Sequence, residues 1–360
     1  MRDIVGDLER WLAAGEKIAL VTLVRTQGST PRLPGARLAV TRSGKMAGSI
    51  SGGCVENDLY ERALHVLDSG QPALASYGIA DDGELGVGLS CSSTIEVLIE
   101  PFAAAAAWQV LRCELADERP VAIAIALSPP ALLGHTLVVR GDGATSGAIA
   151  AELDHQLVAE AQRLLGHGGT NVVACAWQAG QAEIFIEAFA PPRRLFIVGA
   201  AHTAMPLCRL AKILGFRVSV IDARAAYLTL ERFPEADDLQ RAWPHEALAR
   251  VGLDDNSYVV ILTHDPKFDV PALACALRSQ ARYIGIMGSR RTHAQRLAPL
   301  REEGFNDAEL GRIRAPIGLD LGARTPAEIA VAVLAEMLAV SHKRDGCALA
   351  ARTGAVHATH

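Results

Sequence analysis

The chain has 360 residues, of which 50% are hydrophobic and 21% are charged, a balance typical of a folded globular protein and not of a disordered one. Its length predicts about two domains, each large enough for a core of its own. The formal net charge of −5 argues against nucleic acid or an anionic membrane as the partner.

The first residues, MRDIVGDLERWLAAGEK, predict a charged amphipathic helix without the apolar core of a signal peptide. No apolar run is long enough to span a membrane, so we expect a cytoplasmic protein. The seven cysteines are scattered singly, without a CxxC pair, and therefore indicate neither a disulfide framework nor a structural zinc site.

The sequence pattern changes at Pro191-Pro192. Before this point the predicted strands are short and irregularly spaced, whereas strands and helices alternate after it. We expect an α/β protein with an N-terminal α+β domain (1–190), a Rossmann-like C-terminal domain (191–345) and a C-terminal tail (346–360).

A glycine-rich segment, GSTPRLPGARLAVTRSGKMAGSISGGCVE (28–56), contains the first candidate site. The pattern predicts a strand over 46–50 and a helix over 55–67, which leaves the run Ser51-Gly52-Gly53 as a turn before Cys54. The unpaired N–H groups at a helix start bind anions and favour a reactive, metal-binding thiolate. Cys54 is a candidate for such chemistry, and the alternative is a small buried hydrophobic side chain.

Arginines and hydroxyls upstream of this turn predict an anion-binding rim. Arg32 and Arg37, with the hydroxyls of Ser29 and Thr30, cluster around the glycine turns. Taken alone, each arginine is better explained as a solvated surface charge. A second cysteine, Cys91, follows further glycines, and its spacing allows it either to face Cys54 or to pack beneath it.

The N-terminal domain contains an internal duplication. RLAVTRSGKMAGSI (37–50) aligns with TLVVRGDGATSGAI (136–149), and each copy is followed by a helical run and a strand. We expect two similar halves, each with paired strands and a helix, related by a pseudo-twofold axis; the alternative is chance similarity of short elements. The alignment places 150–153 (AAEL) opposite Ser51-Gly52-Gly53-Cys54 and predicts no counterpart of the PRLPGAR turn. A feature that is present in only one of the two copies indicates a function rather than a requirement of the fold.

The C-terminal domain opens with LFIVGAAHTAMPLCRLAKILGFRVSVIDAR, which has the strand, turn, helix and strand of a first Rossmann unit. Gly199 lies in the turn, and Asp222 is placed where an acid meets a ribose hydroxyl. Ala201, followed by His202, replaces the glycine that lets a pyrophosphate approach the backbone. The fold is therefore indicated more strongly than NAD binding.

Two other strands of this domain end in polar loops. SYVVILTHD places His264 and Asp265 at a carboxyl strand end, where ligands bind in open α/β sheets. RYIGIMGSRRT places the run Gly288-Ser289-Arg290-Arg291 at a strand-to-helix turn suited to an anion. A lone loop histidine is more often a surface group than a ligand, and no HExxH spacing indicates zinc.

Seven motifs occur in order along nearly the whole chain: GSTPRLPGARLAVT, GSISGGCVE, TIEVLIEP, VGAAHTA, LTHD, YIGIMGSRRT and PIGLDLGARTPAEIA. In this combination the chain resembles the XdhC/CoxI family, the xanthine dehydrogenase accessory factors. The resemblance implies a chaperone without turnover chemistry of its own. Such a protein binds and shields the molybdenum cofactor (molybdopterin), supports its sulfuration with a cysteine desulfurase, and delivers it to an apo xanthine dehydrogenase-type enzyme. A homo-oligomer, such as a homodimer, is also expected.

By this resemblance Cys54 is the candidate sulfur-transfer residue or molybdenum ligand, together with Glu56. The candidate cofactor-binding residues are Ser29, Arg32, Arg37, Gly52, Gly53, Gly199, His202, Asp222, His264, Asp265, Gly288, Ser289, Arg290 and Arg291. Family members often have a Gly-Cys-Gly-Gly run where this chain has Ser-Cys-Ser-Ser around Cys91, so the role of Cys91 stays open.

Two other functions remain as alternatives. The first is an NAD(P)-dependent oxidoreductase, with Asp222 on the ribose or Arg224 on a 2′-phosphate, although a β-carbon at Ala201 crowds the pyrophosphate. The second is a cysteine-nucleophile enzyme, for which no histidine or asparagine partner has a recognisable spacing.

Overall fold

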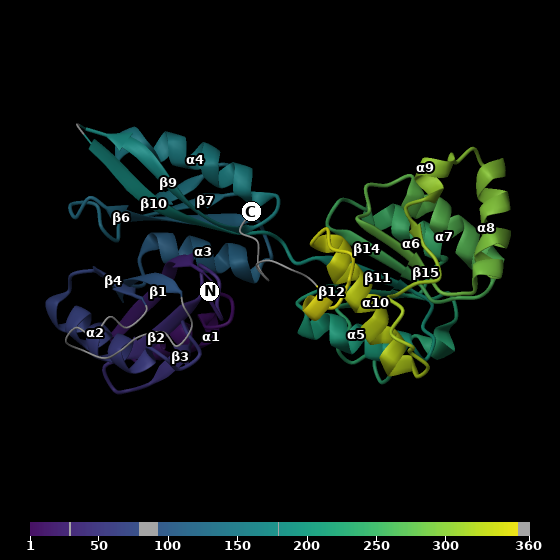
Figure 1. The fold of residues 1–360 in the computed structure, drawn as a ribbon, viewed down its shortest axis with the longest axis horizontal. Helices are drawn as coiled ribbons and strands as arrows, with labels where there is room; N and C mark the ends of the chain where they lie inside the picture. Colours follow the sequence, from purple (N-terminus) through teal and green to yellow (C-terminus); the bar gives the residue numbers. More distant parts are fainter. Residues whose placement is uncertain (29, 79–92, 179, 352–360) are drawn as a thin grey trace. The chain divides into compact units, whose positions relative to one another are not determined.

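The computed structural model describes residues 1–28, 30–78, 93–178 and 180–351. It divides into two compact units, the first ending at Pro191 and the second beginning at Pro192 (Figure 1). No helix in the described ranges is both long enough and apolar enough to cross a membrane.

Unit 1 consists of two antiparallel sheets with the same topology. The first has the strand order β3-β2-β1-β5-β4 and the second has the order β8-β7-β6-β10-β9. The first half contains α1 (Val5–Ala13), β1 (Ile18–Gln27), β2 (Arg37–Thr41), β3 (Met46–Gly48), α2 (Glu56–Ser69), β4 (Ala73–Tyr77) and β5 (Thr94–Phe102). The second half contains α3 (Ala106–Ala116), β6 (Val121–Ser128), β7 (Thr136–Arg140), β8 (Thr145–Gly147), α4 (Ala151–Leu165), β9 (Gly169–Trp177) and β10 (Gly180–Phe189).

The shared topology confirms the internal duplication, and one pair of glycines shows how closely the backbones agree. Gly48 has φ +84° and Gly147 has φ +82°. A β-carbon on Gly48 would lie 2.2 Å from the carbonyl oxygen of Arg37, and one on Gly147 would lie 2.3 Å from that of Thr136. Neither distance is possible, so both copies need glycine at this place.

The turn before the second strand is also present twice, so the prediction that PRLPGAR has no counterpart is wrong. The N–H of Gly35 donates to the carbonyl of Leu23 at 2.8 Å, and the N–H of Gly134 donates to that of Ala126 at 2.9 Å. The second copy also keeps Pro130, Leu132 and Gly134 at the places of Pro31, Leu33 and Gly35, with the same spacing as in the strands that follow, so the turn can be recognised in the sequence as well.

The two sheets of unit 1 share an inner core. Apolar side chains from both sheets and from α1 and α3 meet there, among them Leu20, Trp108 and Phe185. The other face of the first sheet packs on α2, and the other face of the second sheet packs on α4. Burial on both faces explains why β1 and β6 are almost uninterrupted apolar runs.

Unit 2 is a parallel six-stranded sheet with the order β13-β12-β11-β14-β15-β16, which confirms the Rossmann-like prediction. Its strands are β11 (Arg194–Val198), β12 (Arg217–Ile221), β13 (Asp238–Gln240), β14 (Ser257–Ile261), β15 (Tyr283–Ile286) and β16 (Ile313–Arg314). Its helices are α5 (Ala204–Ile213), η1 (Ala225–Tyr227), α6 (Pro244–Val251), α7 (Pro266–Leu277), α8 (Arg290–Glu302), α9 (Asp307–Leu310), α10 (Pro326–Ser341) and η2 (Leu349–Ala351).

The helices of unit 2 cover both faces of its sheet. Helices α5 and α10 share one core with the sheet, and α6, α7 and α8 share the other. The strand order reverses between β11 and β14, and ligands bind at such a reversal in open α/β sheets. The loops that follow β11 and β14 therefore lie where a ligand is expected.

Candidate functional site

The turn between β3 and α2 exposes Cys54. This finding excludes the alternative in which Cys54 is a buried hydrophobic side chain. Gly52 (φ +80°) and Gly53 (φ +123°) have left-handed backbone conformations that other residues rarely adopt. They prevent the helix from starting earlier, so α2 begins only at Glu56.

The carboxylate of Glu56 folds back into this turn and fills it. It accepts hydrogen bonds from the backbone N–H groups of Ser51 (2.9 Å), Gly52 (3.1 Å) and Gly53 (2.8 Å). The hydroxyls of Ser49 (2.8 Å) and Ser51 (2.6 Å) also donate to it. Partial burial acts to raise the pKa of Glu56, but these hydrogen bonds, led by that from Ser51, lower it to about 2.

The predicted anion site at Gly52 and Gly53 is therefore occupied by the chain's own carboxylate. The Cys54 N–H donates to the Ser51 hydroxyl at 2.9 Å, so the backbone of the cysteine is fixed as well. The turn is a closed hydrogen-bonded loop that presents the Cys54 side chain on the surface.

Comparison with the second half shows which part of this turn occurs in the first half alone. There the N–H groups of Ile149 and Ala150 donate to Asp154 at 3.0 and 3.2 Å, so Asp154 corresponds to Glu56. The chain between Ala150 and Asp154 is one residue shorter than that between Ser51 and Glu56. The predicted pairing of Cys54 with Leu153 is thus wrong by one position, because the fully buried Val55 is the partner of Leu153.

The second half has no cysteine at this place, because Glu152 precedes Leu153 there as Cys54 precedes Val55. There the helix begins at Ala151, immediately after the turn, without glycines to unwind it. The longer turn is not needed to build this fold, since the second half forms the same topology without it.

The arginine rim forms only in part. Arg37 is fully buried, and its Nη1 lies 2.5 Å from Oε2 of Glu187 on β10. This ion pair joins the two halves of unit 1, so the prediction that Arg37 binds a ligand at the surface is wrong. Arg32 is partly exposed and lies 3.5 Å from Asp3. Ser29 and Cys91 are outside the described residues.

At the carboxyl edge of unit 2, Gly199 allows two loops to touch. It has φ +96°, and a β-carbon there would lie 2.6 Å from Cγ2 of Thr263, in the loop after β14. His202 and His264 are both exposed in these two loops. The structure therefore brings the predicted loops together at the point where the strand order reverses.

Asp222 is already occupied by protein groups. Its carboxylate accepts from the Ala200 N–H (2.8 Å) and from Arg224 through the backbone N–H (2.9 Å), Nε (3.0 Å) and Nη2 (2.8 Å). Burial acts to raise the pKa of Asp222, and these hydrogen bonds, led by those from Arg224, hold it below its usual value. A carboxylate has about four acceptor positions, and all are taken here. Asp222 locks the turn, which removes the main support for the NAD(P) alternative.

A buried ion pair that no local sequence pattern indicates holds two of the predicted loops. Asp269 on α7 and Arg296 on α8 are buried with their charged atoms 2.6 Å apart. Asp269 also accepts from the Thr263 hydroxyl, and Arg296 donates to the carbonyl of Met287 at 2.9 Å. The two residues lie 27 positions apart on different helices, a spacing that gives no local signal.

The Gly288–Arg291 turn has groups available for an anion. Ser289 caps α8 by accepting from the Thr292 N–H at 3.1 Å. Arg290 and Arg291 are exposed, and neither forms an ion pair with any residue that the structure describes. On the neighbouring loop, Asp265 caps α7 by accepting from the Lys267 N–H at 3.1 Å. Two uncommitted guanidinium groups at a helix start are suited to a phosphate.

Metal binding by protein groups alone finds no support here. In the described ranges no three side chains of histidine, cysteine, aspartate or glutamate are grouped to hold a metal ion.

Comparison with known families identifies the chain. A model described as the XdhC Rossmann domain matches residues 195–337, and one described as the XdhC and CoxI family matches residues 11–78. The chain belongs to the XdhC and CoxI family.

Relatives of this family member cover nearly its whole length. A Bacillus subtilis protein named as a probable xanthine dehydrogenase subunit is 28% identical over 92% of this chain and 95% of its own. The Escherichia coli molybdenum cofactor insertion chaperone PaoD is 27% identical over 93% of this chain and 88% of its own. A Bacillus halodurans crystal structure described as a xanthine dehydrogenase has a TM-score of 0.74 at 26% identity and covers 96% of this chain and 97% of that one.

Proposed function

We propose that this protein is a molybdenum-cofactor insertion chaperone for a xanthine dehydrogenase-type molybdoenzyme. The names of two full-length relatives support this function, one as such a chaperone and the other as part of a xanthine dehydrogenase. The observation that carries the proposal is the exposed Cys54 on a lengthened turn that the second half of unit 1 lacks. A surface thiol on a turn not needed for folding is best explained by cargo contact.

The residues of the turn fit a molybdenum cargo. A thiolate is a soft ligand that suits molybdenum and can also carry sulfur. The cargo brings its own dithiolene and metal, which agrees with a protein surface that offers a single sulfur ligand. Glu56 would keep the turn rigid through its backbone hydrogen bonds, so that Cys54 does not need to be ordered when the cargo arrives.

The phosphate of the cargo requires cationic groups elsewhere, because Glu56 places a negative charge in the Gly-Gly turn. Within unit 2, the candidate groups for a phosphate are Arg290 and Arg291 at the start of α8, beside the loop that carries His264. The buried pair Asp269 and Arg296 would hold these loops in place without touching the cargo.

The proposal extends to the wider pathway. Cys54 would accept the outer sulfur of a persulfide on a cysteine desulfurase, which leaves the desulfurase cysteine as a thiol and Cys54 as a persulfide. The sulfurated cargo would pass to the apo molybdoenzyme, in the cytoplasm. The protein would act as a homo-oligomer and perform no turnover reaction of its own.

The experiment is to produce the protein in cells with intact molybdenum-cofactor synthesis and to measure molybdenum and pterin per chain. We expect Cys54→Ser to lose most of both, whereas Cys113→Ser, at another exposed cysteine of unit 1, retains them. Equal loss in both variants, or equal retention, would show that Cys54 does not contact the cargo.

A further inference from the structure

Glu100 on β5 and Glu187 on β10 are equivalent residues of the two halves of unit 1. Each reaches across to the glycine turn of the other half. A β-carbon on Gly35 would lie 2.9 Å from Oε1 of Glu187, and one on Gly134 would lie 3.6 Å from Oε2 of Glu100. Such reciprocal contacts are what a pseudo-twofold relation between the halves produces.

The cation that accompanies these two acids is present only once. Arg37 lies 2.5 Å from Glu187, and its Nη1 also donates to the carbonyl of Gly35 at 3.0 Å. Thr136 stands at the equivalent place of the second half, and its hydroxyl donates to the carbonyl of Gly134 at 3.1 Å. The hydroxyl thus takes over the hydrogen bond to the turn, but it brings no positive charge.

Glu100 consequently has no cation of its own. Among the described residues it forms no ion pair and no hydrogen bond. Arg37 attracts it without pairing with it, because that guanidinium is committed to Glu187. Burial disfavours the carboxylate more than this attraction favours it, so the pKa of Glu100 is raised to about 7.

The other charged groups near the contact between the two sheets are engaged elsewhere. Glu96 and Glu183, a second pair of equivalent acids, share Arg25 at 2.7 and 2.8 Å. His135, beside the turn glycine, directs its ring to the carbonyl of Ile149 at 3.3 Å. Further pairs are the N-terminal amine with Asp3, Asp7 with Arg10, Glu9 with Arg112, and Glu114 with Arg119 and Arg140. Of these described groups, none is placed to neutralise Glu100.

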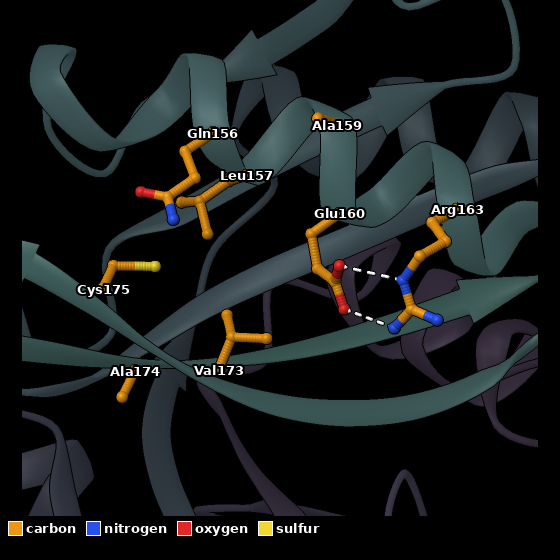
Figure 2. A pocket seen from close by; sticks show the side chains of 8 residues that line it. All are labelled: Gln156, Leu157, Ala159, Glu160, Arg163, Val173, Ala174 and Cys175. Carbon is orange, nitrogen blue, oxygen red and sulfur yellow. Dashed lines mark hydrogen bonds and ion pairs between the residues drawn. The ribbon is translucent and has the colours of Figure 1, made fainter.

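Glu160 on α4 shows the effect of an arginine beside a glutamate in the same unit. Figure 2 shows its carboxylate joined to Arg163 on the next turn of the helix, by hydrogen bonds of 2.6 and 3.0 Å. These bonds, with one from Asn171 at 2.9 Å, hold the pKa of Glu160 below its usual value. Glu160 therefore stays charged at neutral pH, whereas the surroundings of Glu100 favour the neutral acid.

We propose that Glu100 is a proton-binding site and that it makes the association of the two halves of unit 1 depend on pH. The neutral acid packs against the turn at Gly134 without needing a cation. Loss of the proton leaves a partly buried charge without a partner, which weakens the contact between the halves. The proton is exchanged with solvent, which reaches the half-buried carboxyl group. This inference does not depend on the cargo or on Cys54.

The direct test is a pH titration of the full-length protein, labelled with ¹³C at the glutamate carboxyl carbons and followed by NMR. The signal of Glu100 is the one that is absent from Glu100→Gln, and Glu160→Gln identifies that of Glu160. We expect Glu100 to titrate near pH 7 and Glu160 below its usual pKa of 4.5. A Glu100 signal that titrates below about pH 5 overturns the proposal.

Thermal unfolding of unit 1 measures the consequence for stability. Because the pKa of Glu100 is raised on folding, its proton stabilises the folded unit fully below about pH 4.5, and this contribution is lost as the pH rises through 7. Glu100→Gln cannot ionise, so its Tm should lie close to that of wild type near pH 5 and exceed it by roughly 2–6 °C near pH 8.5. A difference in Tm that is the same at both pH values contradicts the proposal.

An arginine at the equivalent place of the second half supplies the matched variant. Thr136→Arg puts a guanidinium beside Glu100 as Arg37 stands beside Glu187, and Glu100 should then titrate well below pH 7. If this variant does not fold, Thr136→Lys brings the same charge on a slimmer side chain. If Glu100 still titrates near pH 7 in a folded variant of either kind, the missing cation is not the cause and the proposal fails.

Discussion

Substitution of Glu56 by glutamine tests whether its carboxylate holds the Cys54 turn. The amide has nearly the same shape, but its NH2 group replaces one of the two carboxylate oxygens and cannot accept hydrogen bonds. Either the N–H groups of Ser51 and Gly52, which bond to Oε1, or that of Gly53, which bonds to Oε2, therefore lose their acceptor. The difference between a usual pKa of 4.5 and one of about 2 corresponds to about 3 kcal/mol. Because the side chain is partly exposed, solvent reduces this value, and we expect Glu56→Gln to cost about 1–2 kcal/mol.

The lowered pKa of Glu56 also predicts how the stability cost of Glu56→Gln changes with pH. The pKa of Glu56 is lower in the folded protein than in the unfolded chain, so its stabilisation is complete above about pH 4.5 and is lost as the pH falls toward 2. The difference in unfolding free energy between wild type and Glu56→Gln should therefore be constant from pH 8 to about 6 and shrink below about pH 5.

Urea denaturation from pH 8 to 3.5, followed by the fluorescence of unit 1, measures this difference. A loss of about 1–2 kcal/mol lowers the Tm by roughly 2–8 °C for a domain of this size. Asp154→Asn is the matched control, because among the described residues Asp154 accepts from two backbone N–H groups, those of Ile149 and Ala150, and its loss should cost less. The reasoning is refuted if Glu56→Gln costs no more than the control, or if its cost is the same at pH 3.5 as at pH 7.

Three further predictions concern unit 2. Asp269→Asn should cost about 3–5 kcal/mol in urea unfolding, because it leaves its buried arginine partner without a counter-charge; a cost below about 1 kcal/mol contradicts this. Gly199→Ala should cost more than Gly215→Ala, since both have positive φ but only Gly199 would also clash with a neighbouring loop; equal Tm values contradict the clash. Arg290→Ala with Arg291→Ala should lower the pterin content of the purified protein without lowering its Tm, and unchanged pterin would place the phosphate elsewhere.

Much of the fold could be predicted from the sequence, because the strands and helices follow regular apolar patterns. The turn glycine at Gly48 and its partner Gly147 mark the duplication, since each is required by a backbone contact within its own half. The Rossmann-like unit could be predicted because a glycine turn after β11 and an acid after β12 lie close together in sequence.

The site was predicted less completely, for reasons that are physical. A glutamate that folds back onto its own turn looks like any acid in a first helical turn, so the role of Glu56 was not foreseen. A buried arginine is rare, and the sequence gives no sign that Arg37 meets Glu187 from the other half. The one-residue difference at Cys54 became visible only when Asp154 could be matched to Glu56 through their hydrogen bonds.

The most direct test of the account replaces the three residues Gly52-Gly53-Cys54 by Ala-Glu, the shorter turn of the second half. The account predicts a protein that folds with a Tm close to that of wild type, because the second half builds the same topology with this turn, but that is purified without molybdenum or pterin. A folded variant that retains the wild-type amount of both would contradict the claim that this turn exists to hold the cargo.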